Sequence, residues 1–411
     1  MRTGSLWARL LELGAAVVED VTLGDAGEVV VAARPRWHQL DRCGVCGRRC
    51  PGFDLGEGRR RWRALDLGAT LAYVEGDAPR VSCHEHGVVV CAVPWARHAS
   101  RFTRCFEDQA AWLAVQCSKR AVAELMRIAW RTVGSICTRV AAEASARRDL
   151  LAGLRWIGID EISHRKGQRY LTVVIDHHSG RLVWAASGRD RATVKAFLDA
   201  LGRERCARIE LVSADMAAWI AGPIAERCPH AVRCVDPFHV VQLATDALDA
   251  IRRDVWNEAR QAGQTALARD LKGARFALWK NPEHLTRRQQ AKLAAIQRTN
   301  QRLYRAYLLK EQLRQIYRLP AEHAIALLNA WLQWARRCRL TPFVKLARTL
   351  TEQRPGIEAA INHGLSNARV EAVNTKIRLI TRRAFGFHSP DALIALAMLT
   401  LAGLCPPLPG R

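Results

Sequence analysis

Three acidic residues have the type and placement that metal-dependent chemistry requires. Asp160 closes the apolar run "WIGID", Asp215 closes the apolar run "IELVSAD", and Glu371 lies early in a helical stretch. Strands of one sheet can place Asp160 and Asp215 side by side, and like charges so close are tolerated when a divalent cation lies between them. Carboxylates suit Mg²⁺ or Mn²⁺, and two such ions can assist both the attacking and the leaving oxygen in a displacement at phosphorus.

The residues around Glu371 favour the same chemistry. A helix macrodipole keeps a carboxylate near the helix N-terminus ionised, and Ser366 or Asn367 can cap this helix. Asn374 and Arg378 follow Glu371 at i+3 and i+7, so they share its face of the helix. We therefore predict that Asn374 and Arg378 bind a nucleic-acid phosphate beside the metals.

Two further acids compete for this site. Glu161 is adjacent to Asp160, but successive strand residues point to opposite faces, so only one of the two is expected to face the metal. Asp236 ends the next strand in "VDPFH", and with His239 it is expected to support the site from its rim. The histidines of "DHHSG" lie in a predicted hairpin turn, which is sufficient to account for them.

Two pairs of soft ligands predict a second, structural metal site. Each pair has two intervening residues, a spacing that lets a tight turn present both side chains to one tetrahedral Zn²⁺. The pairs are Cys43 with Cys46 and Cys83 with His86. Cys50 or Cys91 can replace one of these ligands, or the two pairs can be unrelated loops. Thirteen cysteines in a chain without a recognisable secretion signal indicate reduced thiols rather than a disulfide framework.

The stretch "SKRAVAELMRIAWRTVGSICTRV", residues 118–140, has the pattern of a helix-turn-helix. Its second helix has apolar residues at i, i+3 and i+7 and presents a polar face. The polar residues of that face are Arg131, Thr132, Ser135 and Arg139, which are types that contact phosphates and base edges in a major groove. An ordinary amphipathic helical hairpin would have a similar pattern, since no glycine marks the turn.

Charge and hydropathy restrict the partners. The 411 residues carry a formal net charge of +24, which predicts a polyanionic partner, with nucleic acid favoured over a membrane surface. The N-terminus lacks the pattern of a signal peptide. The apolar run "ALIALAMLTLAGLC" has 14 residues, whereas a bilayer span needs about 20. It is expected to be a buried helix, and the protein to be soluble in the bacterial cytosol, associated with the nucleoid.

The elements that position these residues alternate between strand and helix. Residues 155–236 predict three strands, a helix, a strand, a helix and a strand, hence an α/β sheet of mixed direction. The helix "RATVKAFLDALG" is amphipathic and ends at Gly202. The stretch 238–363 is long, helical and basic. Its tryptophans, which can stack on a base but more often fill a core, are Trp256, Trp279, Trp331 and Trp334.

Four segments together resemble a known family. They are "GIDEISHRKGQRYLTVVIDHHSGRLVW", "VSADMAAW", "VDPFHVVQLATDALDAIRRD" and "SNARVEAVNTKIRLITRRAFGFHS". The chain resembles the DDE transposases of the ISL-three group of bacterial insertion sequences over nearly its whole length. The resemblance implies that Asp160, Asp215 and Glu371 form the catalytic triad of a ribonuclease H-like fold. His86 stands where the family's pattern has a fourth cysteine, which leaves the fourth zinc ligand open.

The resemblance also implies an order of domains. We expect a zinc-binding module at 1–100, a helix-turn-helix domain at 101–152, the first part of the core at 153–237, a helical insertion at 238–364 and the core's last helices at 365–411. The expected activity is metal-dependent cleavage and strand transfer at terminal inverted repeats, performed by a homodimer on duplex DNA. The alternatives are a transposase-derived regulator without activity and a nuclease that cuts without joining.

Overall fold

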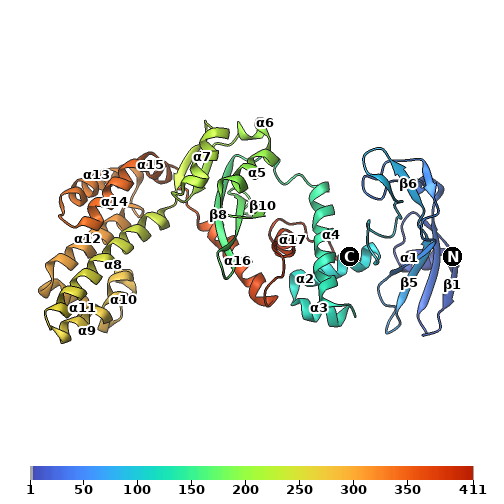
Figure 1. The fold of residues 1–411 in the computed structure, drawn as a ribbon, viewed down its shortest axis with the longest axis horizontal. Helices are drawn as coiled ribbons and strands as arrows, with labels where there is room; N and C mark the ends of the chain where they lie inside the picture. Colours follow the sequence, from blue (N-terminus) through green and yellow to red (C-terminus); the bar gives the residue numbers. More distant parts are fainter. Residues whose placement is uncertain (1–2, 411) are drawn as a thin grey trace. The chain divides into compact units, whose positions relative to one another are not determined.

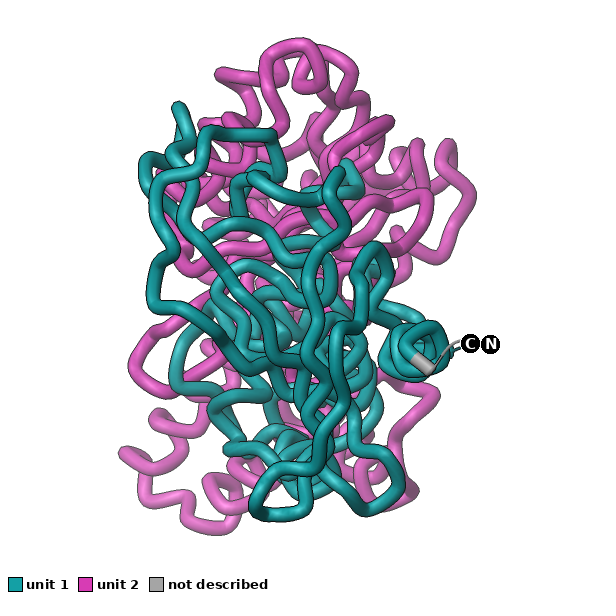
Figure 2. The backbone as a smooth tube through the Cα atoms, turned by 90° about the vertical axis from the view of Figure 1, so that its right-hand side faces the viewer, with its two compact units in different colours: residues 1–150, 379–411 teal, residues 151–378 magenta. Residues whose placement is uncertain are grey.

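The computed structural model describes residues 3–410, which separate into two compact units (Figures 1 and 2). Unit 1 combines the chain up to Leu150 with the segment from Leu379 onward, and unit 2 is Leu151–Arg378. The boundary after Leu150 is close to the one expected after residue 152. The segment 365–411, expected to belong wholly to the core, is instead divided, because its last helix packs in unit 1.

The N-terminal part of unit 1 consists of a short helix, α1 (Thr3–Leu10), and two small sheets. One sheet has the order β1-β2-β5-β4, with β2 and β5 parallel, and the other has the order β3-β6-β7. Trp62 and Trp95 meet edge to face in the core of the larger sheet. The strands are β1 (Ala16–Leu23), β2 (Val29–Pro35), β3 (Gly52–Asp54), β4 (Arg59–Arg63), β5 (Ala72–Asp77), β6 (Arg80–Cys83) and β7 (Gly87–Val90); a 3-10 turn covers Trp37–Gln39.

Four helices form the rest of unit 1. They are α2 (Arg104–Gln116), α3 (Lys119–Leu125), α4 (Trp130–Arg147) and α17 (Pro390–Leu401). Thr103 and Ser118 cap α2 and α3 by accepting hydrogen bonds from first-turn amides. Helix α17, which contains most of the apolar 14-residue run, lies against α4 and α2 in Figure 1, and its Leu393, Leu396 and Leu399 are buried. Its hydrophobicity is thus explained by packing on the helical part of unit 1.

Unit 2 contains a five-stranded sheet with the order β10-β9-β8-β11-β12. The first three strands pair antiparallel, and β8, β11 and β12 run parallel, as the mixed sheet predicted from the sequence requires. The strands are β8 (Trp156–Arg165), β9 (Arg169–Asp176), β10 (Leu182–Ser187), β11 (Leu211–Ala214) and β12 (Val232–Val235). The parallel pairs matter most for the site, because their carboxyl ends share one edge of the sheet.

Several helices lie on or beside this sheet. Helix α5 (Arg191–Leu201) packs on β10 and contacts α6 (Arg203–Cys206) and α7 (Ala218–Arg227), and α16 (Ala368–Arg383) lies against β8. Asp190 caps α5, and Gly202, with φ +81°, ends it, as the sequence predicts. Helix α16 approaches β8 closely, because a Cβ at Gly158 would lie 2.4 Å from Cγ2 of Val370. Gly158 therefore permits the contact that brings α16 to the edge of the sheet.

The insertion is entirely helical within the described chain. Its helices are α8 (Pro237–Gln261), α9 (Thr265–Gly273), α10 (Arg275–Trp279), α11 (Arg287–Thr299), α12 (Gln301–Ile316), α13 (Ala321–Arg337), α14 (Thr341–Glu352) and α15 (Arg354–His363), with a 3-10 turn at Pro282–His284. Trp331 is fully buried and donates its indole N–H to the Leu309 carbonyl. The other three tryptophans pack against the same core. No helix among residues 3–410 is both long and apolar enough to span a bilayer.

Candidate active site and metal centre

Asp160 lies on β8 just beyond the point where the strand stops pairing with β11. The strand does not end at this residue, as the sequence predicted, but continues to Arg165 because β9 pairs with it throughout. On the other side, pairing with β11 stops at Gly158. Asp160 is therefore inside a strand but beside the open end of β11.

Asp215 and Asp236 directly follow β11 and β12. The parallel register pairs Ser213 with Gly158 and Ala214 with Val235, so continuing it places Asp160, Asp215 and Asp236 along one edge of the sheet. Asp215 accepts a hydrogen bond from the Ala217 amide at 2.8 Å. The prediction that the strand-end acids lie on one edge is consistent with this register.

Helix α16 contributes the next side chain. Asn374 Nδ2 donates to Asp160 Oδ2 at 2.9 Å. Asn374 is completely buried, and its Oδ1 has no hydrogen-bond partner among the described residues. The predicted contact of Asn374 with a DNA phosphate does not agree with this burial. Its face of the helix points into the protein, where it orients the Asp160 carboxylate.

Glu371 and Arg378 lie at the more open side of α16. Arg378 Nη1 is 2.9 Å from Glu371 Oε1, so these two residues meet on one face of the helix, whereas Asn374 is buried and does not lie with them at the open side. Both residues line a pocket of about 620 Å³ together with Asp160, Glu161 and Asp236. Within residues 3–410, however, the predicted triad does not form a group whose ligand atoms all lie within 4.8 Å of one another. Glu371 shares the pocket with Asp160 but is paired with arginine.

The pocket disfavours the ionised form of its carboxylates when no cation is bound. Burial, together with the nearby carboxylates of Glu161 and Asp215, raises the pKa of Asp160 to about 7, although the backbone amide of Glu161 and the nearby His239 act to lower it. Burial also raises the pKa of Glu161, and the charge of Asp215 raises it in the same direction. A divalent cation would relieve this repulsion, and the oxygen donors fit Mg²⁺ or Mn²⁺.

Asp160 and Glu161 point in different directions, as alternation along a strand requires. Asp160 is held by Asn374 of α16, whereas Glu161 pairs with Arg189 at 2.9 Å, in the loop before α5. Arg189 also stacks on the ring of Tyr170. Glu161 thus has an ion-pair partner, but its Oε2 is buried without a hydrogen-bond partner in the described part of the chain, and the residue still lines the pocket.

A buried hydrogen-bonded network lies behind the pocket. His177 Nε2 is 2.7 Å from Ser213 Oγ, Ser213 donates to Asn367 Oδ1, and the backbone N–H of Asn367 donates to Asp236 Oδ1 at 3.1 Å. All four residues are at most 5% exposed. Arg369 donates to the His177 carbonyl. The network joins the β9–β10 turn, β11, the end of β12 and the start of α16.

Sequence reasoning missed this network. The "DHHSG" segment does form a turn, with Asp176 accepting from Ser179, but His177 is buried beneath it. Burial and the nearby Arg369 charge lower the pKa of His177 to about 4, so its ring is neutral at pH 7. Asn367 is likewise engaged by Ser213 through its side chain, while Ser366 Oγ accepts from the Ala368 amide. A polar residue inside the apolar strand "ELVSAD" was the available signal.

The soft ligands are gathered in unit 1. The ligand atoms of Cys43, Cys46, Cys83 and His86 all lie within 4.8 Å of one another. Cys83 Sγ is 3.5 Å from His86 Nδ1, and this contact lowers the pKa of the Cys83 thiol to about 6. Three thiols and an imidazole are a donor set that fits tetrahedral Zn²⁺. Of the alternatives left open by the sequence, Cys50 and Cys91 are not part of this group.

The helix-turn-helix expected at 118–140 corresponds to α3, a short turn and α4. Without a glycine in the turn, Arg127 adopts the left-handed conformation, with φ +52°. Arg131 and Ser135 are exposed on α4 and Thr132 is half-buried. Arg139 differs from the prediction. Its Nε and Nη2 atoms both donate to Glu107, a fully buried carboxylate of α2, so it holds the helices together.

Comparison with known proteins matches these regions in the same order. A family model described as "Transposase" matches residues 157–397, more than half of the chain. A "Helix-turn-helix domain of transposase family ISL3" matches residues 91–141. The chain belongs to transposase family ISL3. A third model, the "zinc-finger of transposase IS204/IS1001/IS1096/IS1165", matches residues 39–86, which include all four soft ligands.

Individual relatives of this ISL3 transposase agree with the assignment. A "Transposase for insertion sequence element IS1557" from Mycobacterium tuberculosis is 55% identical over 96% of this chain and 94% of its own length. A "Transposase for insertion sequence element IS1001" from Bordetella parapertussis is 28% identical over 85% of this chain and 86% of its own. The family assignment identifies the chain as an enzyme that cleaves and transfers DNA.

Proposed function

We propose that the pocket at the β8–β11 edge is the site of metal-dependent DNA strand cleavage and strand transfer at the terminal inverted repeats of an insertion sequence. The observation that carries this proposal is the half-buried Asp160, which is held by Asn374 and whose pKa is raised to about 7 beside Asp215 and Glu161. Such crowded carboxylates reduce the stability of the fold, and binding of a cation, which offsets their repulsion, would explain their presence. The matching family supplies the DNA chemistry.

The proposed architecture of unit 2 is a ribonuclease H-like core interrupted by the helical insertion. Its support is the sheet order β10-β9-β8-β11-β12, with three antiparallel strands followed by two parallel ones, and a final helix returning after α8–α15. The insertion separates β12 from α16 in sequence. Asn367 nevertheless binds Asp236 directly, so the two ends of the insertion meet beside the pocket.

Asp160, Asp215 and Glu371 are the proposed ligands of Mg²⁺ or Mn²⁺. When bound, such ions supply Lewis acidity to the phosphate and lower the pKa of the attacking water or hydroxyl. Asn374 fixes the orientation of the Asp160 carboxylate. Glu371 is 58% exposed and must exchange its ion pair with Arg378 to take part. Arg378 is then available for a DNA phosphate, which suits its guanidinium fork.

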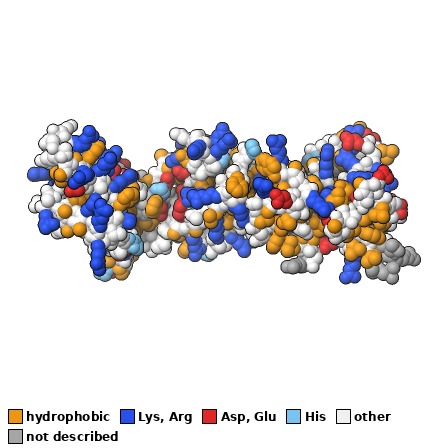
Figure 3. All heavy atoms as spheres, turned by 90° about the horizontal axis from the view of Figure 1, so that it is seen from below, with side chains coloured by type: hydrophobic (Ala, Val, Ile, Leu, Met, Phe, Trp, Pro, Cys, Tyr) orange, Lys and Arg blue, Asp and Glu red, His pale blue; other side chains and the backbone are white. Residues whose placement is uncertain are grey.

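Unit 1 is proposed to bind DNA. Arg131, Thr132 and Ser135 of α4 are the candidates for groove contacts, and Zn²⁺ in the soft-ligand cluster would fix the turns that carry Cys43 and Cys83. Figure 3 shows Lys and Arg side chains spread along the visible face, as contact with a polyanion requires. Because two element ends must be processed together, we also propose a homodimer on DNA.

The test is a cleavage and strand-transfer assay on duplex DNA that contains the element's inverted repeats, with Mg²⁺ or Mn²⁺. We expect specific nicks and joined products from the wild type, and neither from Asp160→Asn, Asp215→Asn or Glu371→Gln, with DNA binding retained. Cleavage without joining would indicate a nuclease. Binding without cleavage in either metal would indicate a regulator and refute the catalytic proposal.

A further inference from the structure

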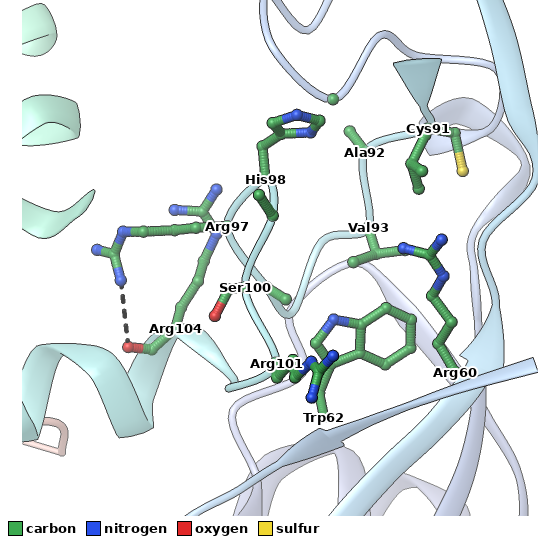
Figure 4. A pocket seen from close by; sticks show the side chains of 14 residues that line it. Arg60, Trp62, Cys91, Ala92, Val93, Arg97, His98, Ser100, Arg101 and Arg104 are labelled. Atoms are coloured by element: carbon green, nitrogen blue, oxygen red, sulfur yellow. Dashed lines mark hydrogen bonds between the residues drawn. The ribbon is translucent and has the colours of Figure 1, made fainter. Parts of the chain in front are cut away.

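A second basic site lies in unit 1, at the junction of the segments that match the zinc-finger and helix-turn-helix models. It is a pocket of about 330 Å³ between strand β4 and the loop that leads into α2. Figure 4 shows its lining, in which the side chains of Arg60 and Arg101 flank the indole of Trp62. The pocket is distinct from the α4 face and from the carboxylate pocket of unit 2.

The floor of this pocket is apolar. Trp62, Cys91, Val93 and Ala96 line it and are each at most 8% exposed. Four arginines and His98 also line the pocket, and no Asp or Glu is among its lining residues. Arginine charges over an apolar floor attract an anion more strongly than charges surrounded by water.

Two of the four arginines are already neutralised. Arg97 extends away from the pocket in Figure 4 and forms ion pairs with Glu107, Asp108 and Glu143. Arg104 pairs with Glu143 at 2.6 Å. These two arginines anchor the loop on the helices behind it and are not available to a ligand.

The other two arginines have unused capacity. Arg101 is exposed, and its side chain has no hydrogen bond or ion pair within residues 3–410. Among residues 3–410, the Nε of Arg60 is buried without a hydrogen-bond partner, and its Nη2 contacts only the carboxylate of Glu57, whose side chain is 85% exposed. A buried guanidinium N–H without an acceptor is costly, so the site favours an anionic oxygen.

We propose that Arg60 and Arg101 bind a backbone phosphate of duplex DNA, making this pocket a DNA contact additional to helix α4. Phosphate oxygens match the arginine fork, as carboxylate oxygens do, and phosphate is the group that DNA presents at regular spacing. The contact reads no bases, so it anchors the DNA irrespective of sequence. This inference rests on the proposed DNA binding by unit 1.

The salt dependence of binding tests the proposal on the full-length, zinc-loaded protein. Fluorescence anisotropy with a labelled inverted-repeat duplex gives the slope of log affinity against log salt concentration. Each phosphate neutralised contributes about 0.9 to that slope. Because the two arginines share one phosphate, Arg60→Ala with Arg101→Ala should flatten the slope by about 0.9 and weaken the binding of inverted-repeat and unrelated duplexes equally. The corresponding double lysine variant keeps the charge and should keep the slope.

A matched control removes the same charge elsewhere in unit 1. Arg9 and Arg36 are exposed and have no ion pair among the described residues, and Arg9→Ala with Arg36→Ala should leave the slope unchanged. An unchanged slope in the pocket variant, or an equal loss in the control, would overturn the proposal. The Arg131→Ala variant separates the two sites, because it should weaken the inverted-repeat duplex more than unrelated DNA. If the wild type binds neither duplex, the proposed DNA binding itself fails.

Discussion

The two candidate metal sites are assembled to different degrees. In unit 1, four soft ligand atoms lie within 4.8 Å of one another. In unit 2, Asp160 and Glu371 share a pocket, but Asn374 holds Asp160 and Arg378 holds Glu371. The first arrangement suits a structural ion that is enclosed by protein. The second suits an ion that binds together with the DNA substrate, when the carboxylates exchange their present partners for the metal.

The difference has a local cause and an electrostatic one. Cys43 and Cys46 lie on one tight turn, where the Gly47 amide donates to the Cys43 carbonyl, and Cys83 and His86 lie on the β6–β7 turn. Each turn therefore fixes its own pair. The carboxylates come from two strands and a helix that follows a long insertion, and their charges repel. Rigid positioning by local turns is possible for the thiols but not for the acids.

The largest effect is expected from loss of zinc. Cys43→Ser should reduce bound zinc from about one per chain to none and open the N-terminal region to protease, since structural zinc contributes on the order of 10 kcal/mol to small zinc modules. Cys50→Ser, outside the cluster, should retain zinc. Elemental analysis and limited proteolysis measure both. Zinc retained by Cys43→Ser, or lost from Cys50→Ser, would contradict the assignment of the preformed zinc site to the four clustered ligands.

The carboxylate site should behave in the opposite way, with substitution stabilising the protein. The pKa of Asp160 is raised to about 7 in the fold, above its ordinary value near 4. Without Mg²⁺ or Mn²⁺, the free energy of unfolding should fall between about pH 4 and 7 by up to about 1.4 kcal/mol per unit from this group. Asp160→Asn should lose that dependence and be more stable at pH 8. Urea unfolding at several pH values measures this dependence. An Asp160→Asn variant less stable than the wild type at pH 8 would contradict the prediction.

A smaller change in the free energy of unfolding is expected from the buried hydrogen-bonded network behind the pocket. Ser213→Ala removes the hydroxyl that joins His177 to Asn367, leaving buried polar groups unpaired, which costs about 1–3 kcal/mol. Ser163 on β8 is exposed, so Ser163→Ala should change stability by no more than about 0.5 kcal/mol. Thermal or urea unfolding compares the pair. Equal effects would mean that the network does not fix the start of α16.

The same contrast explains what the sequence could predict. Zinc ligands two residues apart are visible in a sequence because one turn positions them, and all four predicted ligands are in the cluster. The mixed sheet and the placement of Asp160, Asp215 and Asp236 at one edge followed from hydrophobic patterning, although β8 extends beyond Asp160. Local patterns were sufficient for these features.

Contacts between distant elements were not predictable in this way. Asn374 and Arg139 look like polar helix residues, but Asn374 meets Asp160 across 214 positions and Arg139 meets Glu107 on another helix. Helix α17 has no pattern that tells which unit it joins, and it packs on α4. Such partners depend on tertiary packing, and the spacing of residues along a single sequence does not reveal which distant elements pack together.

The most direct test of this account is a calorimetric titration of Mn²⁺ into zinc-loaded wild type, Asp160→Asn, Asp215→Asn and Glu371→Gln, in the presence of inverted-repeat DNA. If the three carboxylates close on one metal site, each variant should bind Mn²⁺ at least about tenfold more weakly while its zinc content stays unchanged. Wild-type affinity in Glu371→Gln would contradict the account, because Glu371 would then remain the partner of Arg378 and not a metal ligand.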